Sequence, residues 1–236
     1  MSVVKIPCVL IATIGLYRCF TPPNVAAKAE QVSRESIPDR AVFAAIPFLK
    51  PFGVVTWAVG IAEVAIIIAG HFPSWLLSEC VISSLLAQRN LQELQLTPVS
   101  MTGLLLLTSG TLLREYCFRT LSHLFTFELS IREGHRLITT GPYSVVRHPS
   151  YTGSATAFLG MLCWFGARGS WLRESGVLGT IGGKAVFGVL GTAMTVGVIA
   201  GLMRIPGEES ILKRKFGGEW VEWASRVPYL LVPGVY

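Results

Sequence analysis

Hydrophobic residues in this chain gather into long blocks that polar segments separate. The main blocks run at about residues 3–17, 52–70, 99–115, 151–167 and 179–203. Most approach the roughly 20 residues that a helix needs to cross a bilayer, and they lack the short alternating segments of a membrane β-barrel. The pattern therefore predicts an all-α integral membrane protein with about five transmembrane helices.

The N-terminal part has the less regular pattern. The block at 3–17 is short for a span, and a cleaved signal peptide, with small residues at 25–27 near the cleavage site, is the alternative. A shorter apolar stretch at 74–87 predicts an interfacial helix. We therefore divide the chain into an N-terminal membrane region, 1–98, and a second region, 99–236, which holds the candidate chemistry.

Two features inside the predicted spans concern helix packing. Glu63 falls within the second span, where an acid is either functional, protonated, or paired with a polar group of a neighbouring helix. The last span holds glycines of which two pairs have GxxxG spacing: Gly179, Gly183, Gly188, Gly191, Gly197 and Gly201. Such small residues predict close helix packing, within the chain or between two copies.

Composition and charge place the polar segments relative to the membrane. Hydrophobic residues make up 51% of the chain and charged residues 14%, with a net charge of +6. Lys and Arg are concentrated in the segments 118–150 and 204–236, which the positive-inside rule places in the cytosol. The last two spans form a helical hairpin, which brings both segments to one side. Because lipid headgroups explain the excess charge, we expect a lipid bilayer and no nucleic acid as partner.

Metal and soluble nucleotide-binding sites are not indicated. The five cysteines lie in or beside apolar blocks without CxxC spacing and are expected to be small core residues. The histidines lack ligand spacing, since His135 and His148 stand thirteen residues apart, so we expect no metal. No glycine-rich dinucleotide fingerprint follows a predicted strand.

Polar and aromatic residues gather in the two cytosolic segments. The first segment contains His135-Arg-Leu-Ile-Thr-Thr-Gly-Pro-Tyr143 and then Arg147-His-Pro-Ser-Tyr151. Its Pro149 fits the first turn of a helix, where the missing N–H costs nothing. The second segment opens with Arg204-Ile-Pro-Gly-Glu-Glu209.

The second segment continues as an amphipathic tail. Its apolar stripe consists of Leu212, Phe216, Trp220, Trp223 and Val227. Gly217 and Gly218 are predicted to divide the stripe into two short helices. The alternative for this segment alone is an ordinary charged helix exit followed by an interfacial helix.

Taken together, these motifs resemble the isoprenylcysteine carboxyl methyltransferase family over about residues 99–236. The shared elements are a His-x-Leu-(Val/Ile)-Thr-x-Gly-x-Tyr run, Arg-His-Pro-Ser-Tyr-x-Gly, Arg-x-x-x-Glu-Glu after two spans, and a final Val-Pro at Val227. The resemblance implies S-adenosylmethionine-dependent methylation of the C-terminal carboxylate of a prenylated cysteine, at the endoplasmic-reticulum membrane. Glu128 stands in a region where the family often has glutamine, so one cofactor contact differs.

The resemblance also assigns roles to individual residues. It implies that the cofactor binds to His135, Arg136, Leu137, Ile138, Tyr143, His148, Pro149, Ser150, Tyr151 and Glu208. It implies substrate binding by Arg204 and places Arg147 at a position important for activity. Arg147, Arg204 and Glu208 are therefore the candidate catalytic residues.

The chemistry suits these residue types. A carboxylate is ionised at neutral pH, so its methylation needs positioning and charge balance but no general base. An arginine fork can hold a carboxylate, an acid can balance a sulfonium, and Tyr143 or Tyr151 can stack on adenine.

Three alternatives stay open. They are a methyltransferase acting on a phospholipid or other small lipid, a sterol-type membrane reductase that uses a nicotinamide cofactor, and a non-enzymatic adaptor. In the adaptor, Arg147 and Glu208 would form only an ion pair.

Overall fold

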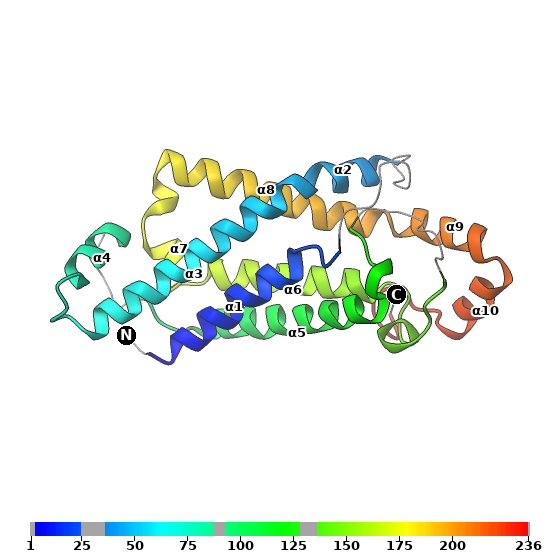
Figure 1. The fold of residues 1–236 in the computed structure, drawn as a ribbon, viewed down its shortest axis with the longest axis horizontal. Helices are drawn as coiled ribbons and strands as arrows, with labels where there is room; N and C mark the ends of the chain where they lie inside the picture. Colours follow the sequence, from blue (N-terminus) through cyan, green and yellow to red (C-terminus); the bar gives the residue numbers. More distant parts are fainter. Residues whose placement is uncertain (1–2, 25–35, 87–92, 128–135, 236) are drawn as a thin grey trace. The chain divides into compact units, whose positions relative to one another are not determined.

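The computed structural model describes residues 3–24, 36–86, 93–127 and 136–235, and this part of the chain contains helices, turns and loops but no strand (Figure 1). The α-helices are α1 (Lys5–Phe20), α2 (Ile37–Ala45), α3 (Leu49–His71), α4 (Ser78–Leu85), α5 (Pro98–Leu121), α6 (Pro149–Gly166), α7 (Trp171–Glu174), α8 (Ile181–Met203), α9 (Ile205–Phe216) and α10 (Gly218–Arg226). Short 3₁₀ turns are η2 (Ile46–Phe48), η4 (Ser122–Leu124), η5 (Gly141–Ser144) and η6 (Val177–Gly179). The all-helical prediction is confirmed for the described residues.

The chain forms two compact units, neither of which is continuous in sequence. The first unit comprises Met1–Arg18, Lys50–Ser109 and Thr156–Thr192. The second comprises Cys19–Leu49, Gly110–Ala155 and Ala193–Tyr236. Helices α5, α6 and α8 each contribute to both units. The predicted hairpin is present as α6 and α8, and the start of α6 and the end of α8 both belong to the second unit.

Two stretches of the described chain are long and apolar enough to cross a membrane. They are Ile37–His71, which joins α2, η2 and α3, and Ile181–Met203, which is α8. Large apolar side chains are exposed along them, among them Val54 and Ile61 on α3 and Ile199 on α8, as expected for helices that face lipid. The other predicted spans coincide with helices α1, α5 and α6 but do not meet the same conditions. The stretch 74–87 holds a shorter helix, α4.

Glu63 is paired with a neighbouring helix, which was one of the outcomes expected for it. Its Oε1 lies 2.5 Å from Nζ of Lys5 on α1, and both side chains are almost completely buried. Lys5 also donates to the backbone carbonyl of Gly169. A buried charge is retained only when it is compensated, so this pair fastens α1 to α3 within the first unit.

The prediction that the glycines of the last span mediate close packing is correct for the pair Gly197 and Gly201, where an added Cβ would lie 3.2 Å from Ala45 of α2 and 3.2 Å from the Tyr151 ring of α6, and wrong for others. A Cβ at Gly179, Gly188 or Gly191 would meet nothing within 4 Å. A still closer approach is made by α5 and α6, where a Cβ at Gly160 would overlap the backbone nitrogen of Leu107. The sequence did not show which glycines of α8 face a neighbouring helix.

The free cysteines were all expected in the core, and this is only partly correct. Cys19 and Cys117 are buried, whereas Cys80 on α4 is exposed. Residues 25–27, where a signal peptide could be cleaved, lie outside the described residues.

Candidate active site

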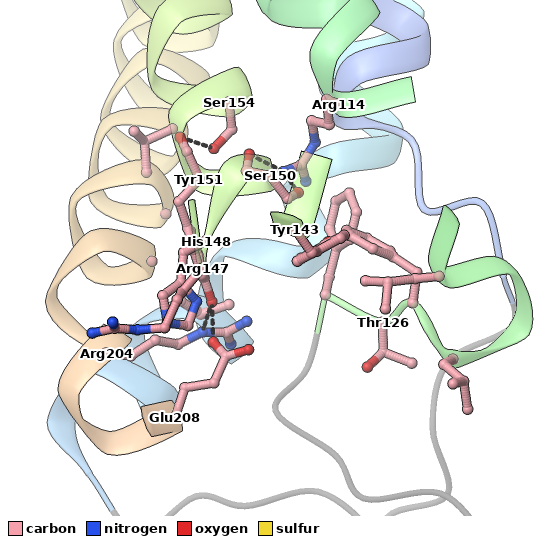
Figure 2. A pocket seen from close by; sticks show the side chains of 18 of the residues that line it. Arg114, Thr126, Tyr143, Arg147, His148, Ser150, Tyr151, Ser154, Arg204 and Glu208 are labelled. Atoms are coloured by element: carbon pink, nitrogen blue, oxygen red, sulfur yellow. Dashed lines mark hydrogen bonds between the residues drawn. The ribbon is translucent and has the colours of Figure 1, made fainter. Parts of the chain in front are cut away.

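The second unit contains a cavity of about 210 Å³. This is many times the roughly 10–15 Å³ that one water molecule needs, so an organic ligand fits. The lining comes from the end of α1, the stretch from α2 to the start of α3, α5 with the residues that follow it, the segment 136–154, and α8 to α10. Figure 2 shows Arg204 and Glu208 on one side of the cavity and Arg114 with Ser150 on another.

Most residues predicted for the site line this cavity. They are Arg136, Leu137, Ile138, Tyr143, Arg147, His148, Ser150, Tyr151, Arg204 and Glu208. Pro149 is fully buried at the first position of α6 and does not line the cavity. His135 and Glu128 lie outside the described residues. The fold thus brings the two motif segments together around one cavity.

Arg204 and Glu208 are linked through the hydroxyl of Tyr151. Arg204 Nε donates a 2.6 Å hydrogen bond to this hydroxyl, which donates one of 2.8 Å to Glu208 Oε2. Arg204 stands at the N-cap of α9, and Glu208 lies in the first turn of that helix. Burial alone lowers the pKa of the Arg204 guanidinium, but Tyr151 and Glu208 raise this pKa more, and the net shift is upward. The site therefore holds a buried, permanently charged cation beside an acid.

Arg147 has different partners from those that the adaptor alternative supposed. Its Nε lies 2.9 Å from Oε2 of Glu209, not of Glu208, and its Nη1 donates to the carbonyls of Val227 and Pro228. His148 Nε2 lies 2.8 Å from the other oxygen of the Glu209 carboxylate. Glu209 therefore fixes both basic residues at the start of α6.

The C-terminal segment is hydrogen-bonded along the start of α6. The backbone nitrogens of Arg147 and His148 donate to the carbonyls of Tyr229 and Leu230, at 2.9 and 2.8 Å. Thr152 Oγ1 donates to the carbonyl of Leu231 at 2.7 Å. The Val-Pro motif at the end of the sequence thus serves to attach the tail beside the Arg-His-Pro motif.

The tail forms the two helices predicted from the sequence, α9 and α10, separated at Gly217. Gly217 has φ of 53°, a left-handed value that favours glycine. Trp223 of α10 is buried against Tyr143 and Cys117, and its Nε1 donates to the Tyr143 carbonyl at 3.1 Å. The helix break therefore allows the tail to form part of the cavity wall.

Tyr143 belongs to the core beneath the cavity and also lines the cavity itself. Burial raises the pKa of its hydroxyl well above the ordinary value, and the neighbouring Cys117 adds to the shift. The phenol consequently stays neutral at physiological pH and can donate a hydrogen bond.

Sequence reasoning missed several lining residues. Arg114 on α5, near the end of the predicted span 99–115, is buried and lines the cavity. An apolar wall comes from helices that carry no motif: Val42, Ala45, Ile46, Leu49, Met194 and Val198. The hydrophobic pattern could not single them out, because such apolar residues occur in any membrane helix.

The arrangement suits an amphiphilic ligand. One side of the cavity carries the buried Arg204 and the partly buried Glu208, while another is apolar. Within the described residues, no three His, Cys, Asp or Glu side chains are grouped so as to hold a metal ion. The groups available for chemistry are therefore hydrogen-bond donors, one acid and fixed positive charges.

Comparison with known proteins agrees with the motifs. A sequence model of the isoprenylcysteine carboxyl methyltransferase (ICMT) family matches residues 102–168. The resemblance to this family, expected from the sequence, is confirmed.

Individual relatives carry the corresponding enzyme names. The chain is 32% identical over 135 residues to protein-S-isoprenylcysteine O-methyltransferase B of Arabidopsis thaliana. It is 30% identical over 131 residues to a probable protein-S-isoprenylcysteine O-methyltransferase of Oryza sativa subsp. indica. These matches cover 55% of this chain in both cases, and 57% and 59% of the two relatives, so the chain spans little more than half of the length of each.

Proposed function

We propose that this protein transfers a methyl group from S-adenosylmethionine to the C-terminal α-carboxylate of a prenylated cysteine. The observation that carries the proposal is the link from Arg204 through Tyr151 to Glu208, at the edge of a partly apolar cavity lined by the family's motifs. The names of the relatives support the same reaction.

The acceptor would bind with its carboxylate at Arg204 and its prenyl chain along the apolar wall. A guanidinium can offer two parallel donors to a carboxylate, which fixes the orientation of the nucleophilic oxygen. The isoprenoid gains about 0.8 kcal/mol per buried CH₂, which favours apolar surroundings such as the side chains of α2 and α8. The carboxylate is already ionised, so the protein has only to orient it.

The residues of the cavity also fit the cofactor. The Glu208 carboxylate reaches the cavity and accepts a hydrogen bond from Tyr151, so it can balance a cationic group. We propose that the binding surface comprises Arg136, Leu137, Ile138, Tyr143, His148, Ser150 and Tyr151, together with His135 and the buried Pro149. When bound, S-adenosylmethionine supplies a methyl group activated by a sulfonium. The protein's task is to exclude water and to align the two ligands.

Arg147 would support activity by holding the C-terminal tail in position. Its contacts with Glu209 and with the carbonyls of Val227 and Pro228 keep the tail against the start of α6. Loss of Arg147 would therefore lower activity by loosening the wall that carries Trp223.

The membrane arrangement completes the proposal. Helices α1, α5 and α6 would cross the bilayer together with α3 and α8, so that five spans place the segments 118–150 and 204–236 in the cytosol. The cofactor would then enter from the cytosol and the prenyl chain from the bilayer. The site of action would be the endoplasmic-reticulum membrane.

A ligand-binding experiment separates this function from its alternatives. Purified full-length protein in detergent is titrated with S-adenosylmethionine and with NADPH, and cofactor binding is followed by calorimetry. We expect S-adenosylmethionine to bind and NADPH not to bind. A sterol-type reductase would instead bind NADPH. Methyl transfer is then compared for S-farnesylcysteine, unprenylated cysteine and a phospholipid, and preference for the phospholipid would favour the lipid methyltransferase.

A further inference from the structure

Arg114 is a buried cation that has no role in the proposed reaction as described above. It lies on α5, its side chain lines the cavity, and only 8% of the residue is exposed. Its position at the charged end of a predicted span would suggest an ordinary flanking arginine that reaches towards water. Burial at the wall of a cavity calls for another explanation.

Among the described residues, the hydrogen-bond partners of Arg114 are neutral groups. Nε donates to the carbonyl of Cys19 at 2.7 Å, and Nη1 donates to the Ser150 carbonyl and hydroxyl at 3.2 and 3.0 Å. Figure 2 shows the contact with Ser150. Within the described part of the chain, Nη2 makes no hydrogen bond and no carboxylate forms an ion pair with Arg114.

In the described part of the chain, aromatic rings and no acid surround the guanidinium. Its central carbon lies 4.8 Å from the ring centroid of Phe127, 5.2 Å from that of Phe118 and 5.7 Å from that of Phe125. Such rings attract a cation but leave its positive charge unneutralised.

Within the described residues, the other buried or partly buried arginines and lysines have an acid within reach. Lys5 pairs with Glu63, Arg147 with Glu209, and Arg204 is linked to Glu208 through one hydroxyl. A buried charge without a counter-ion is costly, so Arg114 favours any anion that enters the cavity. The low polarity of the surrounding rings strengthens this preference, because an anion is attracted more strongly to a buried cation than to an exposed one.

We propose that Arg114 is a second carboxylate-binding residue of the site, in addition to Arg204. This inference rests on the proposed function, in which both ligands carry a carboxylate: the amino-acid end of the cofactor and the prenylated cysteine. Two buried guanidiniums then serve two carboxylates. The hydrogen bonds to Cys19 and Ser150 hold the guanidinium in place before a ligand arrives.

The test compares ligand pairs that differ only in the carboxylate. One pair is S-adenosylhomocysteine and its decarboxylated analogue, and the other is S-farnesylcysteine and its methyl ester. Dissociation constants are measured with the purified full-length protein for the wild type, Arg114→Gln and Arg114→Lys. The matched control is Arg119→Gln, which removes an exposed arginine from the same helix.

In the wild type we expect the carboxylate-bearing member of at least one pair to bind about tenfold more tightly or better, as for a charge-assisted hydrogen bond. For that pair, the ratio of the two dissociation constants should fall towards one in Arg114→Gln and fall severalfold in Arg114→Lys. It should be unchanged in Arg119→Gln. The pair that responds identifies which ligand Arg114 holds.

Unchanged preferences in a folded Arg114→Gln variant would overturn the inference. If that variant does not fold, Arg114→Lys decides in the same way, because a point charge lacks the arginine fork. Absence of any carboxylate preference in the wild type would also overturn it. Wild-type protein that binds neither cofactor analogue nor prenylcysteine would instead refute the proposed function itself.

Discussion

At the scale of single residues, the hydroxyl of Tyr151 is the centre of the site. It accepts a hydrogen bond from Arg204 and donates one to Glu208, so it aligns a cation and an acid that sit four residues apart. The guanidinium also lies 5.6 Å from the centroid of the Tyr151 ring. The aromatic ring and the hydroxyl of Tyr151 therefore both hold the Arg204 guanidinium in position.

Replacing Tyr151 by Phe tests the role of the hydroxyl. The ring packing is kept, but the buried Arg204 and the partly buried Glu208 each lose a partner, which we expect to lower the free energy of unfolding by about 1–3 kcal/mol. The same substitution should also lower the affinity for S-adenosylmethionine. Thermal unfolding in detergent and cofactor titration measure the two effects. Tyr17→Phe, in the first unit, is the control, and identical behaviour of the two variants would contradict the assignment.

At the scale of secondary-structure elements, helices α5 and α6 pack closely against each other in the first unit. A Cβ at Gly160 would lie 2.3 Å from the nitrogen of Leu107 and 2.7 Å from the carbonyl oxygen of Gly103. Both are backbone atoms, which cannot move aside without separating the helices.

Gly160→Ala is therefore expected to destabilise the protein by about 1–3 kcal/mol, the usual cost of overpacking a close contact. Gly188→Ala on α8, where the added Cβ meets nothing within 4 Å, should be neutral or stabilise by up to about 1 kcal/mol through helix propensity. Thermal midpoints of the two purified variants give the comparison. Equal midpoints would show that α5 and α6 are not in close contact.

The sequence predicted elements better than contacts between them. Long apolar blocks located α1, α3, α5, α6 and α8, and the glycine pair divided the tail correctly, because these features depend on local composition. The partner of Arg147 and the exposed glycines of α8 could not be predicted, since they depend on how each helix is rotated about its axis.

The candidate site shows the same limit. Motifs such as Arg-His-Pro identified lining residues because chemistry requires those residue types. Val42 and Met194 have no such mark, and Arg114 was indistinguishable from the usual basic flank of a span.

At the scale of the whole molecule, the proposed topology places both motif segments on one side of the membrane. Val145 and Glu222 are exposed and lie in these two segments. In a variant without native cysteines, Val145→Cys and Glu222→Cys should be labelled from the same side of sealed vesicles by an impermeant maleimide. Native Cys80, exposed on α4, should be labelled from the opposite side in a variant that retains it. Labelling of 145 and 222 from opposite sides would refute the shared site.

We propose that the protein methylates a prenylated carboxylate in the cavity around Arg204 and Glu208. Transfer of a tritiated methyl group from S-adenosylmethionine to S-farnesylcysteine by the purified protein tests it most directly. We predict a base-labile methyl ester, slower turnover with retained cofactor affinity in Arg204→Lys, and weakened cofactor affinity in Glu208→Gln. Arg214→Lys and Glu219→Gln, exposed in the tail, should behave as wild type. Folded protein that forms no ester would refute the proposed function, and full transfer in both Arg204→Lys and Glu208→Gln would refute the roles of these residues.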